Sequence, residues 1–396
     1  GGERRDGNQE AGHVHPYRTR VGSGREFGSK NLAEGSRQRY HRSIFRAVDQ
    51  DSWPHGRRRS VRTRWMMLVI TTAAASATLG FRQAQRRLNP VVELLAQKKP
   101  IFGLYAPSNR RPGRGGAGGA QPAGTPAAPP EPPKTAAQLA QDALAYTQGD
   151  YVFDGTMEGD FDRAFPTFAE FAKAMFDAGA LEKTPSPRLN HALIVKTHLI
   201  APDPKLAADR IARQLNLGVS GIVFVGVESA DEVRTGLAAM RFKSRGGTRP
   251  DDVGDAPARW GMSEKEYKAK ADVWPLNPDG ELVNWTIVES KVGLAHVREI
   301  AAVKGIGVLF PGAGTLRGVF STTDSSGQRV FDAAGWEAAI QQVLAACKEF
   351  NVPCGYPASA NDIETRMKQG FSVFVINWGE QGFKTVDIGR KAAGRD

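Results

Sequence analysis

Residues 284–317 constrain the fold of this chain most, because they read as strand, helix and strand in that order. Residues 285–288 are a short apolar run that ends at the carboxylate Glu289, and residues 306–310 are a second such run that leads into a glycine turn at Gly312 and Gly314. Apolar residues recur at helical spacing between the two runs. The stretch predicts one βαβ unit whose strand ends, where parallel sheets bind ligands, carry a carboxylate and a glycine turn.

The same alternation continues through the chain from residue 88 onward. Short apolar runs predict eight strands, at 101–106, 151–153, 192–197, 221–227, 285–289, 307–310, 352–357 and 371–378. Amphipathic segments predict helices between them, at 136–146, 168–178, 206–215, 230–240, 294–303, 336–350 and 362–368. Eight strands alternating with helices predict an α/β fold, a closed (β/α)₈ TIM barrel over residues 88–396. An N-terminal capping helix at 89–97 is expected to cover its floor.

Two connections are longer than turns. Residues 108–134, after the first strand, are almost entirely Gly, Pro, Ala and Arg, a composition that predicts a flexible insertion. Residues 242–281, after the fourth helix, contain Trp260, Tyr267 and Trp274. So many aromatic side chains predict an ordered insertion, folded over the barrel or against a neighbouring subunit.

The N-terminal region differs from the rest. Residues 1–60 have no periodic apolar pattern and are expected to be disordered or a non-native extension. Residues 61–84 combine arginines, an uncharged apolar run and a small-x-small site, which is typical of a signal peptide and implies a periplasmic or secreted protein. The alternative is a buried apolar helix; the run is too short for a stable membrane span.

Charge and cysteines exclude some function classes. Residues 1–65 hold 15 Lys and Arg against 7 Asp and Glu, so most of the net charge of +11 lies outside the expected barrel. That distribution argues against nucleic-acid binding.

Cys347 and Cys354 fall at a helix end and the next strand start, where we expect buried free thiols rather than a bridge. Their spacing fits no metal site.

The ends of the predicted strands supply the candidate site. Glu158 follows the second strand, Lys196 and His198 the third, and Glu289 the fifth. The sixth strand leads to Gly312, Ala313, Gly314, Thr315 and Arg317. Backbone N–H groups of the glycine turn and the charge of Lys196 suit a carboxylate, and Glu289 suits a divalent cation.

The order of these motifs resembles the HpcH/HpaI aldolase and citrate lyase family. The resemblance is most specific in ESKVGLAHVREIAAVKGIGVLFPGAG, and DYVFDGTMEGDFD, LIVKT and RGGTRP extend it. It implies a (β/α)₈ barrel, usually oligomeric, that makes or breaks carbon–carbon bonds next to pyruvate-like enolates with a divalent metal such as Mg²⁺ or Mn²⁺.

The chain departs from the family pattern at three site positions. Glu289 matches the first metal carboxylate, but Thr315 occupies the slot of the second. Met157-Glu158-Gly159 stands where the family has Glu-His-Gly, and Lys196 replaces the usual Arg, keeping the charge but not the bidentate fork. These departures weaken the expectation of a metal, because one carboxylate holds a divalent ion poorly.

Three functions follow as hypotheses. The first is a carbon–carbon lyase acting on a small 2-oxo or hydroxy acid through a pyruvate-type enolate. In it Lys196, Gly312, Ala313, Gly314 and Arg317 bind the substrate, and Glu158 or His198 transfers the proton. The second is a Schiff-base lyase with Lys196 as nucleophile. The third is a non-catalytic periplasmic barrel that binds a carboxylate. In each a homo-oligomer is expected.

Overall fold

The computed structural model describes residues 86–109 and 132–395. The chain divides into two units, Gly1–Gly80 and Phe81–Asp396, and every described residue lies in the second. The expected extension at 1–60, the signal peptide at 61–84 and the centre of the 108–134 insertion therefore lie outside the described residues. The two ends of that insertion are joined, because the Asn109 side chain bonds the N–H and the carbonyl of Lys134, both at 2.7 Å.

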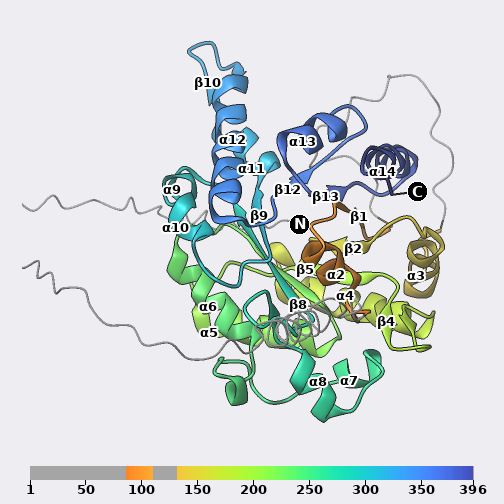
Figure 1. Ribbon diagram of the computed structural model, residues 1–396. Coiled ribbons are helices and arrows are strands. Elements are labelled where there is room, and N and C mark those ends of the chain that lie inside the picture. Colours follow the sequence, from red (N-terminus) through yellow and green to blue (C-terminus); the bar gives the residue numbers. More distant parts are fainter. Residues whose placement is uncertain (1–85, 110–131, 396) are drawn as a thin grey trace, which may run out of the picture. The chain divides into compact units, whose positions relative to one another are not determined.

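The eight predicted strands all lie in one parallel sheet (Figure 1). They are β1 (Ile101–Tyr105), β2 (Tyr151–Asp154), β5 (Ala192–Lys196), β6 (Gly221–Phe224), β8 (Leu282–Val288), β9 (Val308–Pro311), β12 (Gly355–Pro357) and β13 (Val373–Ile376). Neighbours pair in the order β12, β13, β1, β2, β5, β6, β8, β9, and β7 (Val273–Trp274) pairs with the start of β8. The alternation of strands and helices in the sequence therefore gives the predicted α/β architecture.

The sheet is curled into a half-barrel whose two ends are β9 and β12. Between these ends a single parallel bridge joins Leu309 to Cys354, and the Leu309 N–H donates to the Pro353 carbonyl at 3.0 Å. Every other neighbouring pair in the curl is joined by a ladder of several residues. The expectation of a closed barrel is thus met in part, as a curled parallel sheet.

The predicted helices are present in the predicted order with shifted ends, and four further helices, over 256–259, 264–270, 313–319 and 380–392, were not predicted. They are α2 (Pro90–Ala96), α3 (Ala136–Ala145), α4 (Phe161–Asp177), α5 (Pro204–Asn216), α6 (Ala230–Met240), α7 (Ala256–Arg259), α8 (Glu264–Lys270), α9 (Lys291–Ala295), α10 (Val297–Ala301), α11 (Ala313–Val319), α12 (Ala333–Phe350), α13 (Ile363–Gln369) and α14 (Glu380–Ala392). Side-chain caps set several starts: Thr135 and Ser229 form capping boxes on α3 and α6. The single helix expected at 294–303 is two short helices that meet at His296.

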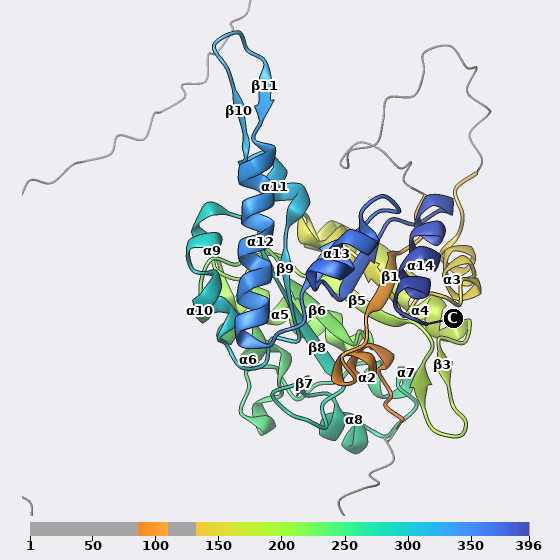
Figure 2. The ribbon, with the colours of Figure 1, turned by 45° about the horizontal axis from the view of Figure 1, so that its top comes forward.

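The chain also contains short strands that its sequence pattern does not predict. Two antiparallel hairpins, β3 (Leu181–Glu182) with β4 (Arg188–Leu189) and β10 (Ser321–Thr323) with β11 (Arg329–Phe331), lie outside the parallel sheet. The second stands away from the sheet beyond α11 and the start of α12 (Figure 2). Strands of two or three residues are too short to show a periodic pattern.

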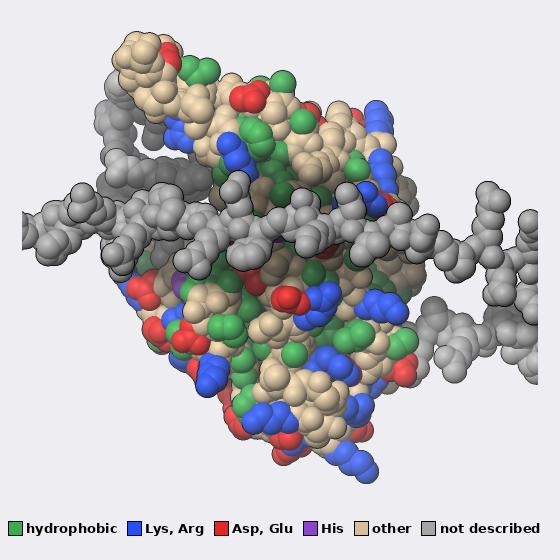
Figure 3. Space-filling model, turned by 90° about the vertical axis from the view of Figure 1, so that its left-hand side faces the viewer, with side chains coloured by type: hydrophobic (Ala, Val, Ile, Leu, Met, Phe, Trp, Pro, Cys, Tyr) green, Lys and Arg blue, Asp and Glu red, His purple; other side chains and the backbone are tan. Residues whose placement is uncertain are grey.

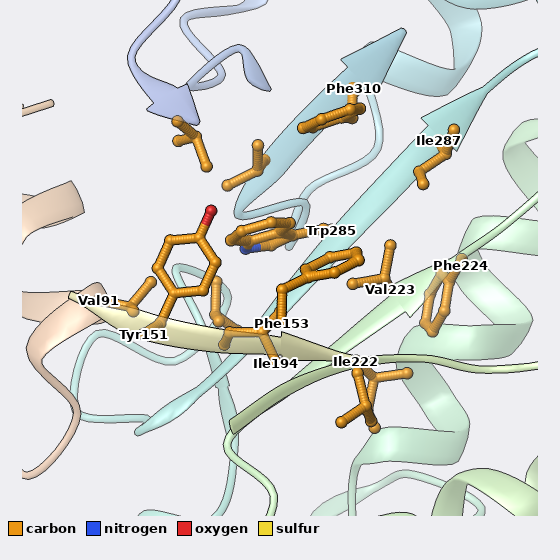
Figure 4. Close-up of a cluster of buried hydrophobic side chains, with 14 of the residues drawn as sticks. Val91, Tyr151, Phe153, Ile194, Ile222, Val223, Phe224, Trp285, Ile287 and Phe310 are labelled. Atoms are coloured by element: carbon orange, nitrogen blue, oxygen red, sulfur yellow. The ribbon is translucent and has the colours of Figure 1, made fainter. Parts of the chain in front are cut away.

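Aromatic side chains fill the inside of the curl (Figure 4). The Trp285 ring from β8 lies 5.2 Å from that of Tyr151 and 5.9 Å from that of Phe153, both on β2, and 6.4 Å from that of Phe310 on β9. Gly103 of β1 must lack a side chain, because a Cβ there would enter the Tyr151 ring. Residues two apart share a strand face, so Tyr105, Lys196 and Glu289 continue the same inner face towards the carboxyl ends of their strands.

The insertion at 242–281 is ordered, as its aromatic residues predict. Trp260 and Tyr267 are fully buried against α5: the Trp260 indole donates to the Gly218 carbonyl at 2.9 Å, and the Tyr267 hydroxyl to that of Leu215 at 3.3 Å. Arg249 is also buried, with its guanidinium 4.2 Å from the Phe242 ring centre. These aromatic side chains therefore fold the insertion onto α5 and the turn that follows it.

The expectation of free thiols is wrong. Cys347, near the end of α12, and Cys354, just before β12, form a disulfide with Cα atoms 5.7 Å apart. The turn between the helix and the strand brings the two residues within the separation that a disulfide bridges. The spacing of the two cysteines in the sequence does not show how close the fold brings them.

The described surface mixes charges. On the face shown in Figure 3, Lys and Arg side chains alternate with Asp and Glu rather than forming one basic surface. Among the described residues, no helix is both long and apolar enough to cross a bilayer.

Candidate active site

Lys196 and Glu158 form an ion pair at the carboxyl-end rim of the sheet. The Lys196 ammonium, at the end of β5, donates to Oε2 of Glu158 at 2.6 Å. The Lys196 side chain is 15% exposed and that of Glu158 37%, so the pair is accessible but partly shielded from water. A short 3₁₀ turn, Thr156–Glu158, places Glu158 beside the end of β2.

His198 joins this pair through the backbone. Its Nδ1 lies 2.8 Å from the Glu158 carbonyl oxygen. A carbonyl only accepts hydrogen bonds, so Nδ1 carries a proton and, in the neutral ring, Nε2 carries the lone pair. The three residues expected to do chemistry, Lys196, Glu158 and His198, are therefore together.

Tyr105 belongs to the same cluster and was missed in the sequence. A Cβ placed on Gly155 would lie 3.5 Å from the Lys196 side chain and 3.7 Å from the Tyr105 ring. Burial raises the pKa of the Tyr105 hydroxyl, an effect that the nearby Lys196 ammonium opposes. The signal was present: Tyr105 ends the first strand, two residues after Gly103, on the inner face.

Glu289 forms a second group, with Gly226 and Gly312. Its Oε1 accepts a hydrogen bond from the Gly226 N–H at 2.8 Å, and its side chain is buried. Gly226 has φ +59°, which favours glycine there. A Cβ on Gly312 would lie 2.6 Å from Oε2 of Glu289, so glycine is needed at that position for space. Strand β6 lies between β5, which ends at Lys196, and β8, which Glu289 follows.

The expected glycine turn is the start of helix α11. Gly312 is the N-cap residue and offers no capping side chain, and the Ala313 carbonyl accepts a bond from the Trp336 indole at 2.9 Å. Gly314 and Thr315 are exposed in the first turn. Arg317 lies one turn further on and stacks its guanidinium 3.9 Å from the Phe331 ring centre of β11.

The donor set at Glu289 does not make a protein-built metal site. Among residues 86–109 and 132–395, no group of three or more His, Cys, Asp or Glu side chains could hold a metal ion. Thr315 offers a neutral hydroxyl where the resemblance implies a second carboxylate.

Fold and rim together define a class: an α/β protein with a curled parallel sheet and a cationic, carboxylate-containing site at the carboxyl ends of its strands. The family model for HpcH/HpaI aldolase/citrate lyase matches residues 191–385. The match to this family agrees with the resemblance that the sequence motifs indicate.

Two individual proteins illustrate what the chain is similar to. The chain is 26% identical to the 2-dehydro-3,6-dideoxy-6-sulfogluconate aldolase of Pseudomonas putida over 178 residues, which are 44% of this chain and 62% of that protein. It therefore spans less than two thirds of that relative's length. An HpcH/HpaI aldolase/citrate lyase family protein from Burkholderia cenocepacia J2315 has a TM-score of 0.52 at 20% identity, covering 77% of this chain and 98% of its own.

A second solved structure is similar. Macrophomate synthase has a TM-score of 0.50 at 17% identity, covering 81% of this chain and 96% of its own. At these identities the solved structures bear on the fold alone.

Proposed function

We propose that this protein is a carbon–carbon lyase of the aldolase type that acts on a small 2-oxo or hydroxy acid through a pyruvate-type enolate. The observation that carries the proposal is the Lys196–Glu158 ion pair on the inner face of the sheet, at the strand ends where parallel sheets bind ligands. The family of residues 191–385 supports the reaction class.

Lys196 binds the substrate in this account. Its ammonium has three donors, of which Glu158 takes one, so donors remain for the carboxylate and the 2-oxo oxygen. At the start of α11 the Gly312 N–H already donates to the Val288 carbonyl at 2.9 Å, so the N–H groups of Ala313 and Gly314 are the backbone donors offered to the same carboxylate. Arg317 would have to leave the Phe331 ring to reach it, so we assign it no direct contact.

The cleavage step uses these residues in order. Nε2 of His198 takes the proton from the 4-hydroxyl group, the C3–C4 bond breaks, and its electron pair forms the enolate of the 2-oxo acid while C4 becomes an aldehyde. The Lys196 ammonium stabilises the enolate oxygen, where negative charge develops. The proton held on His198 then passes to C3, giving the keto acid. Glu158 keeps Lys196 in place; it is the alternative base, but its carboxylate is engaged by the ammonium.

The site offers few ligands to a divalent metal. Mg²⁺ or Mn²⁺ would find one protein carboxylate, Glu289, and that carboxylate accepts a hydrogen bond from Gly226. One carboxylate compensates only half the charge of a divalent ion, so the residues present do not fit a resident metal.

The two other hypotheses predict different behaviour. A Schiff-base mechanism needs the Lys196 nitrogen free as a nucleophile, whereas that nitrogen is paired with the Glu158 carboxylate at 2.6 Å. A carboxylate-binding protein would use the same ammonium but would leave bound 2-oxo acids unchanged. Borohydride trapping of a pyruvate adduct tests the first, and turnover tests the second.

We also propose three properties of the whole protein. It is exported from the cytoplasm, its sheet closes into a barrel, and it forms a homo-oligomer. The Cys347–Cys354 disulfide supports export, since disulfides persist in oxidising compartments. The Leu309–Cys354 bridge supports closure between β9 and β12. Size measurement by light scattering tests the assembly.

The function is tested by retro-aldol turnover. A panel of 4-hydroxy-2-oxo acids is incubated with the protein and the pyruvate released is measured with lactate dehydrogenase. We expect release above the blank for at least one acid, and loss of it in Lys196→Met. Tight pyruvate binding without any release would identify a binding protein instead.

A further inference from the structure

A cavity of about 880 Å³ opens at the amino-terminal end of the sheet, opposite the rim with Lys196 and Glu289. Its lining includes Ile306, Cys354 and Ser372, which lie one or two residues before the starts of β9, β12 and β13. The ends of α2, α10 and α12 surround it, and Figure 2 shows these helix ends at the lower end of the sheet. The proposed lyase reaction does not use this cavity.

Part of the cavity wall is apolar. Trp274, Leu276, Phe350 and Val352 contribute side chains, and Leu276 is 41% exposed. Leaving such side chains in contact with water costs free energy that an apolar ligand would recover. The volume is in the range of small-molecule sites in proteins.

The charged part of the wall has one sign. Lys98, Lys99, Lys304 and Lys348 line the cavity and no Asp or Glu does. In the described part of the chain, none of these four lysines has an ion-pair partner. They come from three separate segments, so the fold brings them together rather than local sequence.

The C-terminal ends of the helices neutralise only part of the positive charge of these lysines. Lysines near helix C-termini compensate the partial negative charge of the last carbonyls, about half a charge per helix. Three helices therefore balance about one and a half of the four positive charges. The remainder gives the cavity a net attraction for anions.

One wall of the cavity is held in place covalently. The Cys347–Cys354 disulfide closes the segment that carries Lys348, Phe350 and Val352. Asn351, at the end of α12, turns this segment through a left-handed conformation with φ 52°. Pre-formed walls lower the cost of ordering a site when a ligand binds.

We propose that this cavity binds a soluble organic anion, a carboxylate or phosphate ester carried on an aromatic or branched apolar body. The lysines hold the anionic group, and Trp274, Leu276 and Phe350 cover the apolar body. The site is separate from the proposed active site and does not depend on the lyase function.

The test is calorimetric titration of the whole chain with 1-naphthyl phosphate, with inorganic phosphate and 1-naphthol as the two half-ligands. We expect the ester to bind more tightly than either half. Lys304→Gln combined with Lys348→Gln should weaken ester binding by about tenfold. Lys265→Gln with Lys384→Gln, two exposed lysines outside the cavity, should change it by less than about twofold. Leu276→Gln should weaken the ester but not inorganic phosphate.

A Lys196→Met variant distinguishes binding of the ester at this cavity from binding at the rim. Because Lys196 lies at the rim, this variant should bind the ester as the unchanged protein does. Loss of ester binding in Lys196→Met would overturn the proposal by placing the ligand at the rim. Equal binding of ester and 1-naphthol would also overturn it, as would no binding of the ester. Lysine-dependent binding to vesicles of phosphatidylcholine and phosphatidylglycerol, without binding of the soluble ester, would show a lipid surface instead. Circular dichroism confirms that each variant is folded.

Discussion

The ammonium of Lys196 lies 2.6 Å from a carboxylate oxygen of Glu158, although the residues are 38 apart in sequence and follow different strands. Neighbouring strands β2 and β5 bring them together at the carboxyl-end rim. The pair is partly shielded from water, and in such a site a fixed cation stabilises a developing enolate more strongly than it does in bulk water.

Lys196→Met should reduce kcat/KM for pyruvate-releasing substrates by about 100- to 1000-fold, because the only proposed cation for the enolate is removed. Glu158→Gln should cost about tenfold, since Lys196 keeps its charge but loses its anchor. The matched control is Lys173→Met, which breaks an exposed pair with Asp177 on α4. Steady-state kinetics that fall equally in Lys173→Met would show that the effect is not specific to the rim.

Gly312→Ala should destabilise the protein by about 1–3 kcal/mol, because the added methyl group meets the Glu289 carboxylate. Gly314→Ala, two residues further along the same helix, places its methyl group in open space and should be neutral or stabilising. Urea unfolding of the two variants gives the comparison. Equal stabilities would contradict the placement of Glu289 against Gly312.

Replacing Cys347 and Cys354 by Ser together should lower the free energy of unfolding by about 2 kcal/mol, the chain-entropy value for so short a loop. Thiol titration of the unfolded, unreduced protein is the direct check. It should find no free thiol, and two free thiols would contradict the bridge.

The free energy of unfolding should fall in acid, in part because His191 becomes protonated. Burial lowers the pKa of this ring below its ordinary value of 6.5. Its Nε2 faces the Tyr146 carbonyl at 2.9 Å, and Nδ1 is buried without a partner. A lowered pKa in the folded state means that the full stability is present above the unfolded pKa of about 6.5 and is lost as the pH falls through the folded value. Urea unfolding at pH 8 and pH 5 should show a smaller loss in His191→Gln than in the unchanged protein; identical losses would exclude His191 as the cause.

Thr315→Asp should create divalent-metal affinity where the present donor set has little. Two carboxylates neutralise a divalent ion, whereas Glu289 alone leaves half its charge uncompensated. Calorimetric titration with Mn²⁺ should therefore give tighter binding in Thr315→Asp than in the unchanged protein. No response to Mn²⁺ in the variant would show that residue 315 does not approach Glu289.

The sequence predicts the order of the elements well, because all eight strands carry apolar runs that belong to a sheet buried on both faces. It also places Lys196, Glu158 and Glu289 at strand ends. It does not show that Gly312 starts a helix, because a Gly-Ala-Gly segment is compatible with either a turn or a helix start. Tyr105 was missed because an aromatic residue at the end of an apolar strand is expected to be part of the hydrophobic core rather than of a site.

The most direct test of the proposed lyase is exchange of the methyl protons of pyruvate in deuterium oxide, followed by proton NMR. Enolate formation replaces these protons even without an aldehyde partner, so the measurement does not require the natural substrate. We expect exchange well above the protein-free rate, reduced by about 100-fold in Lys196→Met and unchanged in Lys173→Met. Exchange at the protein-free rate, or equal exchange in Lys196→Met, would contradict it.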